Sequence, residues 1–449
     1  MNTQPFAALL FATCIALAPH ARANEEARIR SAFEYFFPLY EMARLRFNAV
    51  MEPSNPNRTA PNSISHRRRL LDHSFRTVTA PNNDTLYSTS RIDLADAPVR
   101  VTTPSIPGRY YSLQFMDFYT ENIAILGSGS SGAGPLEAWV VGPEWKGAAP
   151  PGVRLVRSST NDVWMLVRIL IDGPADAPEV NRIQDQIRVT PMATVPVERP
   201  QKTRPVKDPE PPQFLAAVNE MLQRNPPAAG QRAFVRSLEA LGIRPGEIDV
   251  WDRLDAGVKN GWLQAWPRMT GDVRSLLTSF FTRDVRGWQY PPPEVGRFGT
   301  DYRLRATVAH SGIGALDLSE ALYLSTRTDN RSETLLGANR YKVTIPPGGI
   351  PVDGFWSITM YEVMPDGRFF LVDNPIRRYT MGDRTAGLVK NADGSIDLLA
   401  QHAQPTDPAQ LANWLPAPKG PFRFALRAYL PRRELVAGEA PLPVVERIQ

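Results

Sequence analysis

Arg109-Tyr110-Tyr111-Ser112-Leu113-Gln114-Phe115-Met116-Asp117-Phe118-Tyr119 is the stretch that decides the fold class. Successive side chains of a β-strand point to opposite faces of a sheet, so this run presents two distinct sets of side chains. One face carries Arg109, Tyr111, Leu113, Phe115, Asp117 and Tyr119, and the other carries Tyr110, Ser112, Gln114, Met116 and Phe118. The pattern predicts a β-strand of unusually high polar content.

Similar short segments lie on both sides of this run and again in the second half of the chain. Proline is abundant, with 43 residues in 449, and it separates these segments. Such punctuation favours many short strands joined by turns over a helical bundle. We expect strands at residues 86–94, 99–103, 123–126, 138–141 and 163–171, then at 340–345, 355–361, 368–372, 396–401 and 422–429. Their spacing is typical of an antiparallel sandwich or barrel, and Asp393-Gly394 predicts a hairpin turn.

Helical spacing of apolar residues appears at the N-terminus and in the middle of the chain. Residues 24–51 predict a helix that Pro38 should kink or divide. Asp176 is a plausible N-cap for a helix over 176–187. Further helices are expected at 214–222, 231–241 and 251–277, and residues 301–310 fit either element. The expected division is 24–190 for the N-terminal helix and first β domain, 191–296 for a linker and helical segment, and 297–449 for a second β domain.

The first 23 residues read as a secretory signal peptide. Residues 6–18 are apolar but too short to span a bilayer, and Ala21-Arg22-Ala23 matches a signal-peptidase site. Cleavage after Ala23 would remove Cys14, the only cysteine, so no disulfide or thiol chemistry is expected. No other apolar segment approaches membrane-spanning length. We therefore expect a soluble periplasmic or secreted protein without stable membrane insertion.

The net charge of +5 comes from basic residues that are spread along the chain, which argues against a nucleic-acid partner. Gly127 to Gly132 fits G-x-G-x-x-G, but the helix that a dinucleotide site requires does not follow. The histidines lack the paired spacing of a zinc site. Neither a metal nor a cofactor is expected.

Several motifs together resemble two bacterial families that usually occur as companions. Asn82-Asn83-Asp84-Thr85-Leu86-Tyr87-Ser88, Asp93-Leu94 and Gly108-Arg109-Tyr110-Tyr111 with Gln114, Asp117, Tyr119 and Thr120 resemble the domain of unknown function 1254. The stretches from Asp353 to Tyr361, Asn374-Pro375 with Arg378-Tyr379, Asp393-Gly394-Ser395, Asn413 to Pro416, and Arg427-Ala428-Tyr429 resemble the domain of unknown function 1214. The resemblance implies a mainly β protein with two jelly-roll-like antiparallel domains. It brings no agreed activity and no catalytic residue.

The best candidate site lies in the first β half, around Asp84 and Asp117. Two carboxylates that flank a cleft are what glycoside cleavage requires, so these two are the acid/base candidates. The expected ligand-binding residues are Asn83, Tyr87, Arg109, Tyr111, Gln114, Tyr119, Asn374 and Arg378. In the competing structural interpretation, Asp84 pairs with Arg109 across strands and fixes the sheet register.

Two functions stay open at this point. The first is a cofactor-independent extracytoplasmic hydrolase acting on a carbohydrate-like substrate, with a small-molecule or glycan ligand. The second is a non-catalytic binding or assembly protein that forms a jelly-roll homo-oligomer. A fold does not carry a function by itself, so the sequence does not choose between them.

Overall fold

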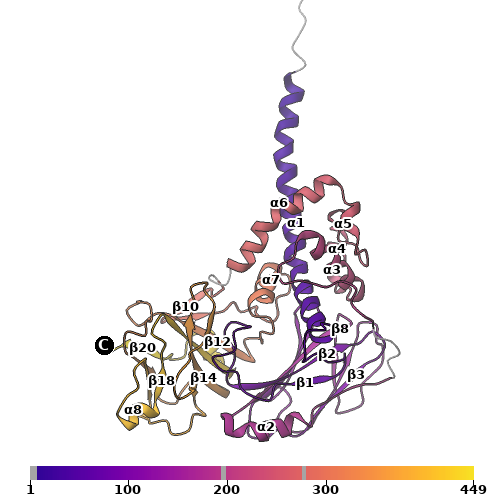
Figure 1. The fold of residues 1–449 in the computed structure, drawn as a ribbon. Helices are drawn as coiled ribbons and strands as arrows, with labels where there is room; N and C mark the ends of the chain where they lie inside the picture. Colours follow the sequence, from indigo (N-terminus) through magenta and orange to yellow (C-terminus); the bar gives the residue numbers. More distant parts are fainter. Residues whose placement is uncertain (1–7, 194–198, 276–279, 449) are drawn as a thin grey trace, which may run out of the picture.

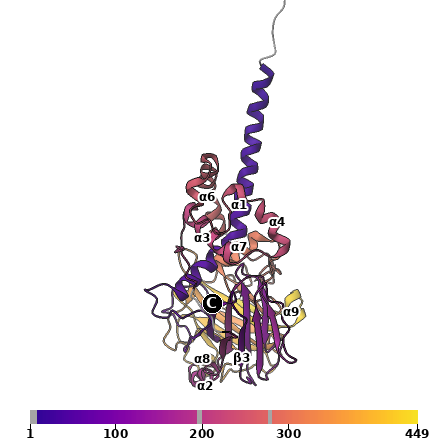
Figure 2. The ribbon, with the colours of Figure 1, turned by 90° about the vertical axis from the view of Figure 1, so that its right-hand side faces the viewer.

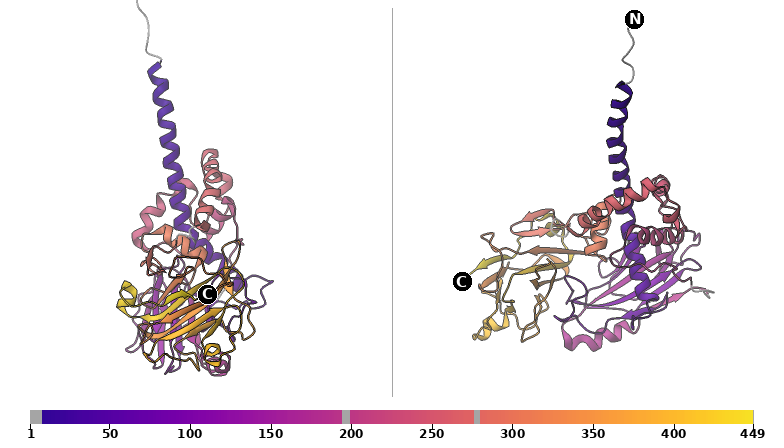
Figure 3. Two further views of the ribbon diagram at one scale, coloured as in Figure 1. Left: turned by 90° about the vertical axis from the view of Figure 1, so that its left-hand side faces the viewer. Right: turned by 45° about the horizontal axis from the view of Figure 1, so that its top comes forward.

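The computed structural model describes residues 8–193, 199–275 and 280–448 (Figure 1). Its order along the chain is a long helix, a β module, a group of helices and a second β module. In Figure 3 the two β modules lie side by side, and the helices cover one end of the first module. The fold is mainly β, as the alternating segments predict.

The first β module contains one five-stranded sheet and one four-stranded sheet. Its interface sheet has the order β1 (Ile64–His66), β2 (Thr85–Asp93), β8 (Asp162–Leu170), β4 (Tyr111–Asp117) and β5 (Asn122–Gly127), all antiparallel. Its outer sheet has the order β7 (Arg154–Arg157), β6 (Leu136–Val141), β3 (Val99–Thr103) and β9 (Arg188–Pro191). The helix α2 (Ala177–Gln184) connects β8 to β9.

The second β module is also built from two sheets. Its interface sheet has the order β10 (Arg283–Val285), β11 (Trp288–Tyr290), β12 (Ala321–Thr326), β19 (Phe422–Pro431), β14 (Val352–Val363) and β15 (Phe369–Leu371), with β16 (Thr380–Gly382) also on β14. Its outer sheet has the order β18 (Trp414–Pro416), β17 (Ile396–Gln401), β13 (Tyr341–Ile345) and β20 (Val444–Arg447). The short helices α8 (Pro408–Ala412) and α9 (Arg433–Ala437) lie between its strands.

The two modules share one topology. In the interface sheets, β2, β8 and β4 occupy the places of β12, β19 and β14; in the outer sheets, β7-β6-β3-β9 corresponds to β18-β17-β13-β20. Even the one parallel pair of each outer sheet recurs, β6 with β7 and β17 with β18. A helix joins the last two strands in both cases, α2 in one and α9 in the other. The chain is therefore a structural duplication that its sequence does not reveal as a repeat.

Each module buries the apolar faces of its two sheets against one another. In the first module Tyr111, Leu113 and Phe115 of β4 point into this core, as their alternation predicts. In the second module Trp356, Ile358 and Met360 of β14 do the same. The opposite faces of the two interface sheets are left to meet across the boundary between the modules. There Tyr110, Leu170, Phe355 and Tyr429 form a small apolar cluster of their own.

The helical part packs around α1 (Ala8–Val50), which projects from the body at its N-terminal end (Figures 1 and 2). Its helices are α3 (Pro211–Arg224), α4 (Arg232–Arg236), α5 (Val250–Arg253), α6 (Ala256–Ser275) and α7 (Tyr302–Ser311). Arg46 Nε of α1 lies 3.1 Å from Asp162 Oδ1 of β8 and fastens this part to the first module. Of the expected leader, residues 1–7 lie outside the described residues, and 8–23 continue the backbone of α1.

Several sequence-based expectations need correction. Of the two outcomes expected at Pro38, division of the helix is wrong, because α1 is helical throughout Ala8–Val50; the kink stays a prediction. Residues 301–310, which fitted either element, form α7. The short strands β1, β7 and β9 were not predicted, because each has only three or four residues and a partly exposed pattern. Asp393-Gly394 makes a tight turn with Gly394 at φ +83°, but it leads into β17 from a segment that is not a strand.

Candidate functional site: the boundary between the β modules

Residues of the two sets of sequence motifs meet across the boundary between the modules. Asn82 Nδ2 donates to the Tyr429 hydroxyl over 2.8 Å. Asp84, which directly precedes β2, accepts hydrogen bonds from Ser357 Oγ at 2.9 Å and from Thr380 Oγ1 at 3.2 Å. Its Oδ2 lies 3.9 Å from Arg427 Nη1 on β19. The polar ends of the two motif sets therefore build one shared, buried network.

Arg427 is the cation of this network, and it is 4% exposed. Its guanidinium donates to Thr359 Oγ1 at 2.6 Å and to the Tyr361 hydroxyl. Burial raises the pKa of Asp84, and the Arg427 charge partly offsets that rise. The predicted pair of Asp84 with Arg109 is wrong. The Asp84 carboxylate faces Arg427 instead, because the beginning of β2 packs against the second module.

A second arginine, Arg168 of β8, lies on the first module's side of the boundary and is also 4% exposed. Its guanidinium donates to Gln114 Oε1 at 2.7 Å and to the Gly314 carbonyl at 2.6 Å. It stacks 5.3 Å above the ring of Tyr87, its neighbour on β2. Two of the predicted ligand residues, Tyr87 and Gln114, thus surround a buried cation that the sequence interpretation did not select.

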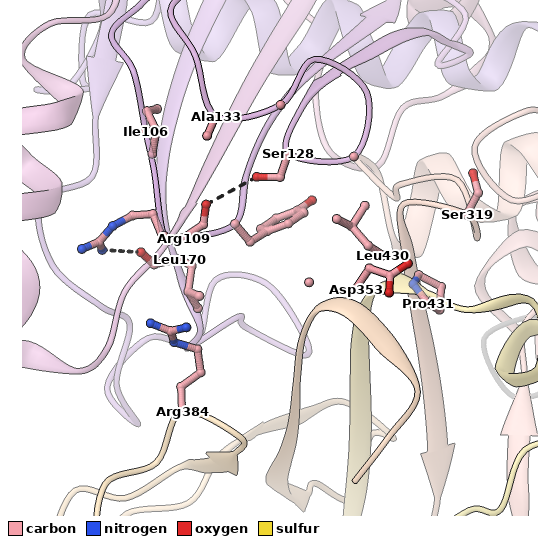
Figure 4. Close-up of a pocket in the computed structure, with 15 residues that line it drawn as sticks. Ile106, Arg109, Ser128, Ala133, Leu170, Ser319, Asp353, Arg384, Leu430 and Pro431 are labelled. Carbon is pink, nitrogen blue, oxygen red and sulfur yellow. Dashed lines mark hydrogen bonds between the residues drawn. The ribbon is translucent and has the colours of Figure 1, made fainter. Parts of the chain in front are cut away.

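Next to this network an open cleft of about 580 Å³ runs between the modules (Figure 4). This volume is ordinary for a small-molecule site. Figure 4 shows Arg109 of the first module and Arg384 of the second on the same side of the cleft, with Arg109 bonded to the Leu170 carbonyl. Leu430, Asp353 and Ser319 lie on the other side. The remaining lining residues are Ile106, Gly108, Tyr110, Ser128, Gly129, Gly132, Ala133, Leu170, Gly354 and Pro431.

The charges along the cleft are paired within the protein. Arg109 donates to both oxygens of Asp176, at 2.6 and 3.1 Å. Arg384 makes two bonds of 2.7 Å to Asp172. These bidentate pairs hold each guanidinium plane in place and leave the cleft with balanced charge. The cleft consequently offers fixed hydrogen-bond donors and acceptors without a strong field of either sign.

The segment from Gly127 to Gly132 is a surface turn that forms part of the cleft wall. The Gly127 carbonyl accepts hydrogen bonds from the backbone N–H groups of Ser130, Ser131 and Gly132. Gly127 itself has φ +138°, and a Cβ there would lie 2.3 Å from the Tyr111 carbonyl oxygen. Only glycine fits at that position, so the turn is a packing feature of β4 and β5 rather than a dinucleotide motif.

Asp117 lies at the opposite end of the interface sheet from Asp84. It pairs with Val163 on β8, whereas the Asp84 carbonyl accepts from the N–H of Ile171. Eight residues of extended strand separate these points by roughly 26 Å. Asp117 accepts hydrogen bonds from the backbone N–H groups of Tyr119 and Glu121, which close a tight turn. The two carboxylates do not flank one cleft.

A second titratable cluster surrounds Asp117. Glu121 Oε1 lies 3.5 Å from Arg305 Nη1, and Arg305 is 1% exposed. Burial raises the pKa of Glu121 to about 7, with a further contribution from the Asp117 charge. Arg305 stacks on the rings of Tyr35 and Tyr302, each 5.0 Å away. This cluster joins α1, α7 and the turn after β4.

The other predicted ligand residues from the first module serve local structure. Asn83 Nδ2 donates to the Leu71 carbonyl. The Tyr111 ring is in the core, and its hydroxyl donates to the Gly132 carbonyl at 2.8 Å. Tyr119 donates to the Asn225 carbonyl at 3.0 Å.

Asn374 and Arg378, predicted in the second module, lie away from the cleft lining. Asn374 Oδ1 accepts from the N–H of Arg378 and closes their shared loop. Arg378 Nη1 donates to the carbonyls of Leu411, Ala412 and Trp414, at the C-terminal end of α8. Trp414 itself is 1% exposed, so it plugs the core rather than offering a stacking surface.

Sequence reasoning missed Arg168, Arg384 and Glu320, whose Oε1 accepts a hydrogen bond from the Tyr110 hydroxyl at 2.6 Å. Arg168 follows strict alternation on β8, and a lone arginine on a face shared with Trp164 and Leu166 was the available signal. Arg384 and Glu320 lie in connections, where no periodicity places a side chain.

Among described residues, no three His, Cys, Asp or Glu side chains are grouped as metal ligands. The same part of the chain contains no helix long and apolar enough to cross a membrane.

Comparison with known proteins agrees with the motif assignment. A search of curated proteins found no match. The fold matches the crystal structure of the VPA0106 protein from Vibrio parahaemolyticus, with a TM-score of 0.73, 21% sequence identity, and coverage of 95% of this chain and 100% of that one. A putative uncharacterized protein from Burkholderia cenocepacia gives a TM-score of 0.47 at 14% identity, covering 98% of both chains.

Family models place the two halves directly. Residues 61–191 match the model "Protein of unknown function (DUF1254)", and residues 320–433 match "Protein of unknown function (DUF1214)". These ranges fall on the first and second β modules, so the network around Asp84 and Arg427 joins one family domain to the other. The chain belongs to the proteins that carry a DUF1254 domain followed by a DUF1214 domain.

Proposed function

We propose that this protein binds a neutral, hydroxyl-rich ligand of the carbohydrate class in the cleft between its two β modules. The observation that carries the proposal is the pair of oriented guanidiniums, Arg109 and Arg384, contributed by different modules to one cleft of about 580 Å³. Sugar hydroxyls both donate and accept hydrogen bonds. They suit a wall in which each arginine is already neutralised by an aspartate.

The rest of the cleft lining fits the same class of ligand. Ser128 and Ser319 supply hydroxyl groups, and Asp353 supplies a carboxylate. Leu170 and Leu430 supply apolar surface, which the C–H face of a sugar ring can cover. Most of the lining surface is polar, which suits a ligand that makes many hydrogen bonds.

Binding, rather than hydrolysis, is what the geometry supports. The separation of roughly 26 Å between Asp84 and Asp117 is far above the range of about 5–10 Å that glycoside cleavage by two carboxylates requires. Both carboxylates are also occupied by protein hydrogen bonds. The hydrolase hypothesis therefore rests on no assembled acid/base pair.

The proposal also covers the location of the protein and the type of its β modules. We place the binding activity in the periplasm or outside the cell, on the basis of the A-x-A site at Ala21 to Ala23. We interpret the duplicated modules as a jelly-roll-like pair, supported by their matching two-sheet topology.

Assembly into a homo-oligomer is the alternative function. The exposed large apolar side chains of the described residues, such as Val78, Leu263 and Val444, are spread over separate elements.

The test is a glycan array probed with the mature protein, followed by calorimetric titration of the glycan that binds best. Arg384→Ala should weaken binding at least tenfold, because it removes a charged donor worth about 1.5–3 kcal/mol. The matched control is Arg368→Ala, which removes an exposed arginine that also pairs with an aspartate. Unchanged affinity in Arg384→Ala, or an equal loss in Arg368→Ala, would refute the cleft as the site. Light scattering of the same sample measures its molar mass and so tests the homo-oligomer alternative.

A further inference from the structure

The duplicated topology brings two equivalent sets of side chains to the boundary between the modules. On each interface sheet an arginine of the central strand pairs directly with a tyrosine on one neighbouring strand and with a serine on the other. We call these the first and second rungs. The first rung is Tyr87, Arg168 and Ser112, and the second rung is Tyr323, Arg427 and Ser357.

The first rung contains a buried cation that lacks an anionic partner. Among the described residues, no carboxylate oxygen lies within 4.0 Å of the Arg168 guanidinium, and its two Nη atoms donate to neutral oxygens. Arg168 Nε is buried and has no hydrogen-bond partner. A buried charge without a counter-charge is costly, and an unpaired guanidinium is correspondingly a strong site for an anion.

The second rung is only weakly neutralised. Asp84 approaches Arg427 no closer than 3.9 Å, and its carboxylate instead accepts hydrogen bonds from Ser357 and Thr380. The other carboxyl group near the rungs is Glu320, whose Oε1 accepts from the Tyr110 hydroxyl at 2.6 Å. Burial raises the pKa of both carboxyl groups. Asp84 and Glu320 both direct their hydrogen bonds to hydroxyl groups, so among the described residues neither carboxyl group hydrogen-bonds to a rung arginine.

Phenol groups complete the surroundings. Arg427 lies 5.6 Å from the ring of Tyr323, and the Tyr323 hydroxyl donates to the Tyr429 hydroxyl at 3.2 Å. Tyr87 and Tyr323 keep partial exposure although the arginines beside them are buried. The two tyrosine rings are therefore less completely covered than the arginines with which they pair.

We propose that the two rungs together form an internal site for a small oxyanion, held by Arg168 and Arg427 and by the hydroxyl of Tyr87. Arg168 and Arg427 come to the boundary from separate sheets, so each can present N–H groups to an anion held there, and the Tyr87 phenol adds a neutral donor. The site is distinct from the cleft, whose arginines are already paired with aspartates. An anion there would also bind both modules to each other.

Inorganic phosphate is the probe for this site, titrated into the full mature chain by calorimetry at constant ionic strength. The wild-type protein should bind phosphate, and Arg168→Gln should raise the Kd at least tenfold, with Arg427→Gln acting in the same direction. Arg368→Gln is the exposed control and should change nothing. Arg384→Ala should keep phosphate binding, so the loss of glycan binding and the loss of phosphate binding report on separate sites.

A second variant keeps the test decisive if the arginine variants fail to fold. Tyr87→Phe removes one hydroxyl donor and keeps the ring, and it should raise the phosphate Kd several-fold. Crystals of the wild-type chain soaked in selenate should show an anomalous peak within hydrogen-bond distance of Arg168 Nε. The proposal is overturned if wild-type protein binds no phosphate, if Arg168→Gln binds it as well as wild type does, or if the selenate peak lies only in the cleft.

Discussion

Asp84 Oδ2 of the first β module lies 3.9 Å from Arg427 Nη1 of the second, and both side chains are about 95% buried. The two residues are 343 positions apart in the sequence but belong to one hydrogen-bonded group with Ser357 and Thr380. Contacts of this kind are specific to the paired arrangement of the two domains. They define which faces of the modules meet and consequently where the cleft opens.

Removing the Asp84 charge should destabilise the paired modules. Asp84→Asn leaves Arg427 buried without its carboxylate, which costs about 3 kcal/mol in comparable buried pairs. Chemical denaturation at pH 8 measures the loss. The control is Asp366→Asn, because Asp366 makes an exposed pair with Arg368 whose removal should matter by less than about 0.5 kcal/mol. Equal stability of Asp84→Asn and wild type would show that the pair contributes nothing.

Stability should depend on pH through Glu121. Its folded-state pKa of about 7 lies above the ordinary value of 4.5, so the folded protein holds this proton more tightly than the unfolded chain does. The free energy of unfolding should therefore decrease as the pH rises from about 4.5 to 7, by roughly 2–3 kcal/mol from this group.

Glu121→Gln isolates that contribution, because glutamine resembles the neutral carboxyl group. The variant should match wild type near pH 4.5 and exceed its stability at pH 8, where wild type carries a buried charge beside Asp117. Melting temperatures of both proteins across this range provide the measurement. If the difference in melting temperature between wild type and variant stayed constant across this pH range, Glu121 would not titrate in this way.

Arg378 should matter for stability and not for the ligand. Its Nη1 donates to three carbonyl groups at the end of α8, and neither Arg378 nor these three partners line the cleft. Arg378→Ala should lower the free energy of unfolding by about 1–3 kcal/mol, because those buried acceptors lose their donor. Glycan titration of the same variant should give the wild-type Kd. A selective loss of affinity with unchanged stability would return Arg378 to the list of ligand residues.

Removal of the predicted leader should cost no stability. From Asn24 onward, where side chains of α1 are described, Asn24 is exposed and Ile29 is the first fully buried side chain. Protein that begins at Asn24 should therefore melt within about 1 °C of a longer form, because no described core contact is lost. N-terminal sequencing of protein recovered from the periplasm should give Asn24 as the first residue. A mature start beyond Ile29 would contradict both the cleavage site and the packing argument.

How much of this follows from sequence depends on the kind of signal. Period-2 alternation identified β4 and β14 and correctly grouped Tyr111, Leu113 and Phe115 on one face of β4, since a strand's two faces are fixed by its backbone. The equivalence of the modules was not detectable, because matching strands such as β8 and β19 share topology without a visible sequence repeat.

The candidate site was predicted only in part. Asp84, Tyr87, Gln114 and Arg109 do lie at the boundary or in the cleft, but the sequence paired Asp84 with the wrong arginine. Local pattern identifies which side chains share a face of one sheet. It contains no information on which distant sheet that face will cover, and Arg168, Arg384 and Arg427 acquire their roles only from that packing.

The most direct test of the central claim is a crystal structure of the mature protein soaked with the glycan selected on the array. The account predicts density for the sugar between the modules, with hydroxyl oxygens within about 3.2 Å of both Arg109 and Arg384. Density on another surface, with the cleft between Arg109 and Arg384 filled by water alone, would contradict it.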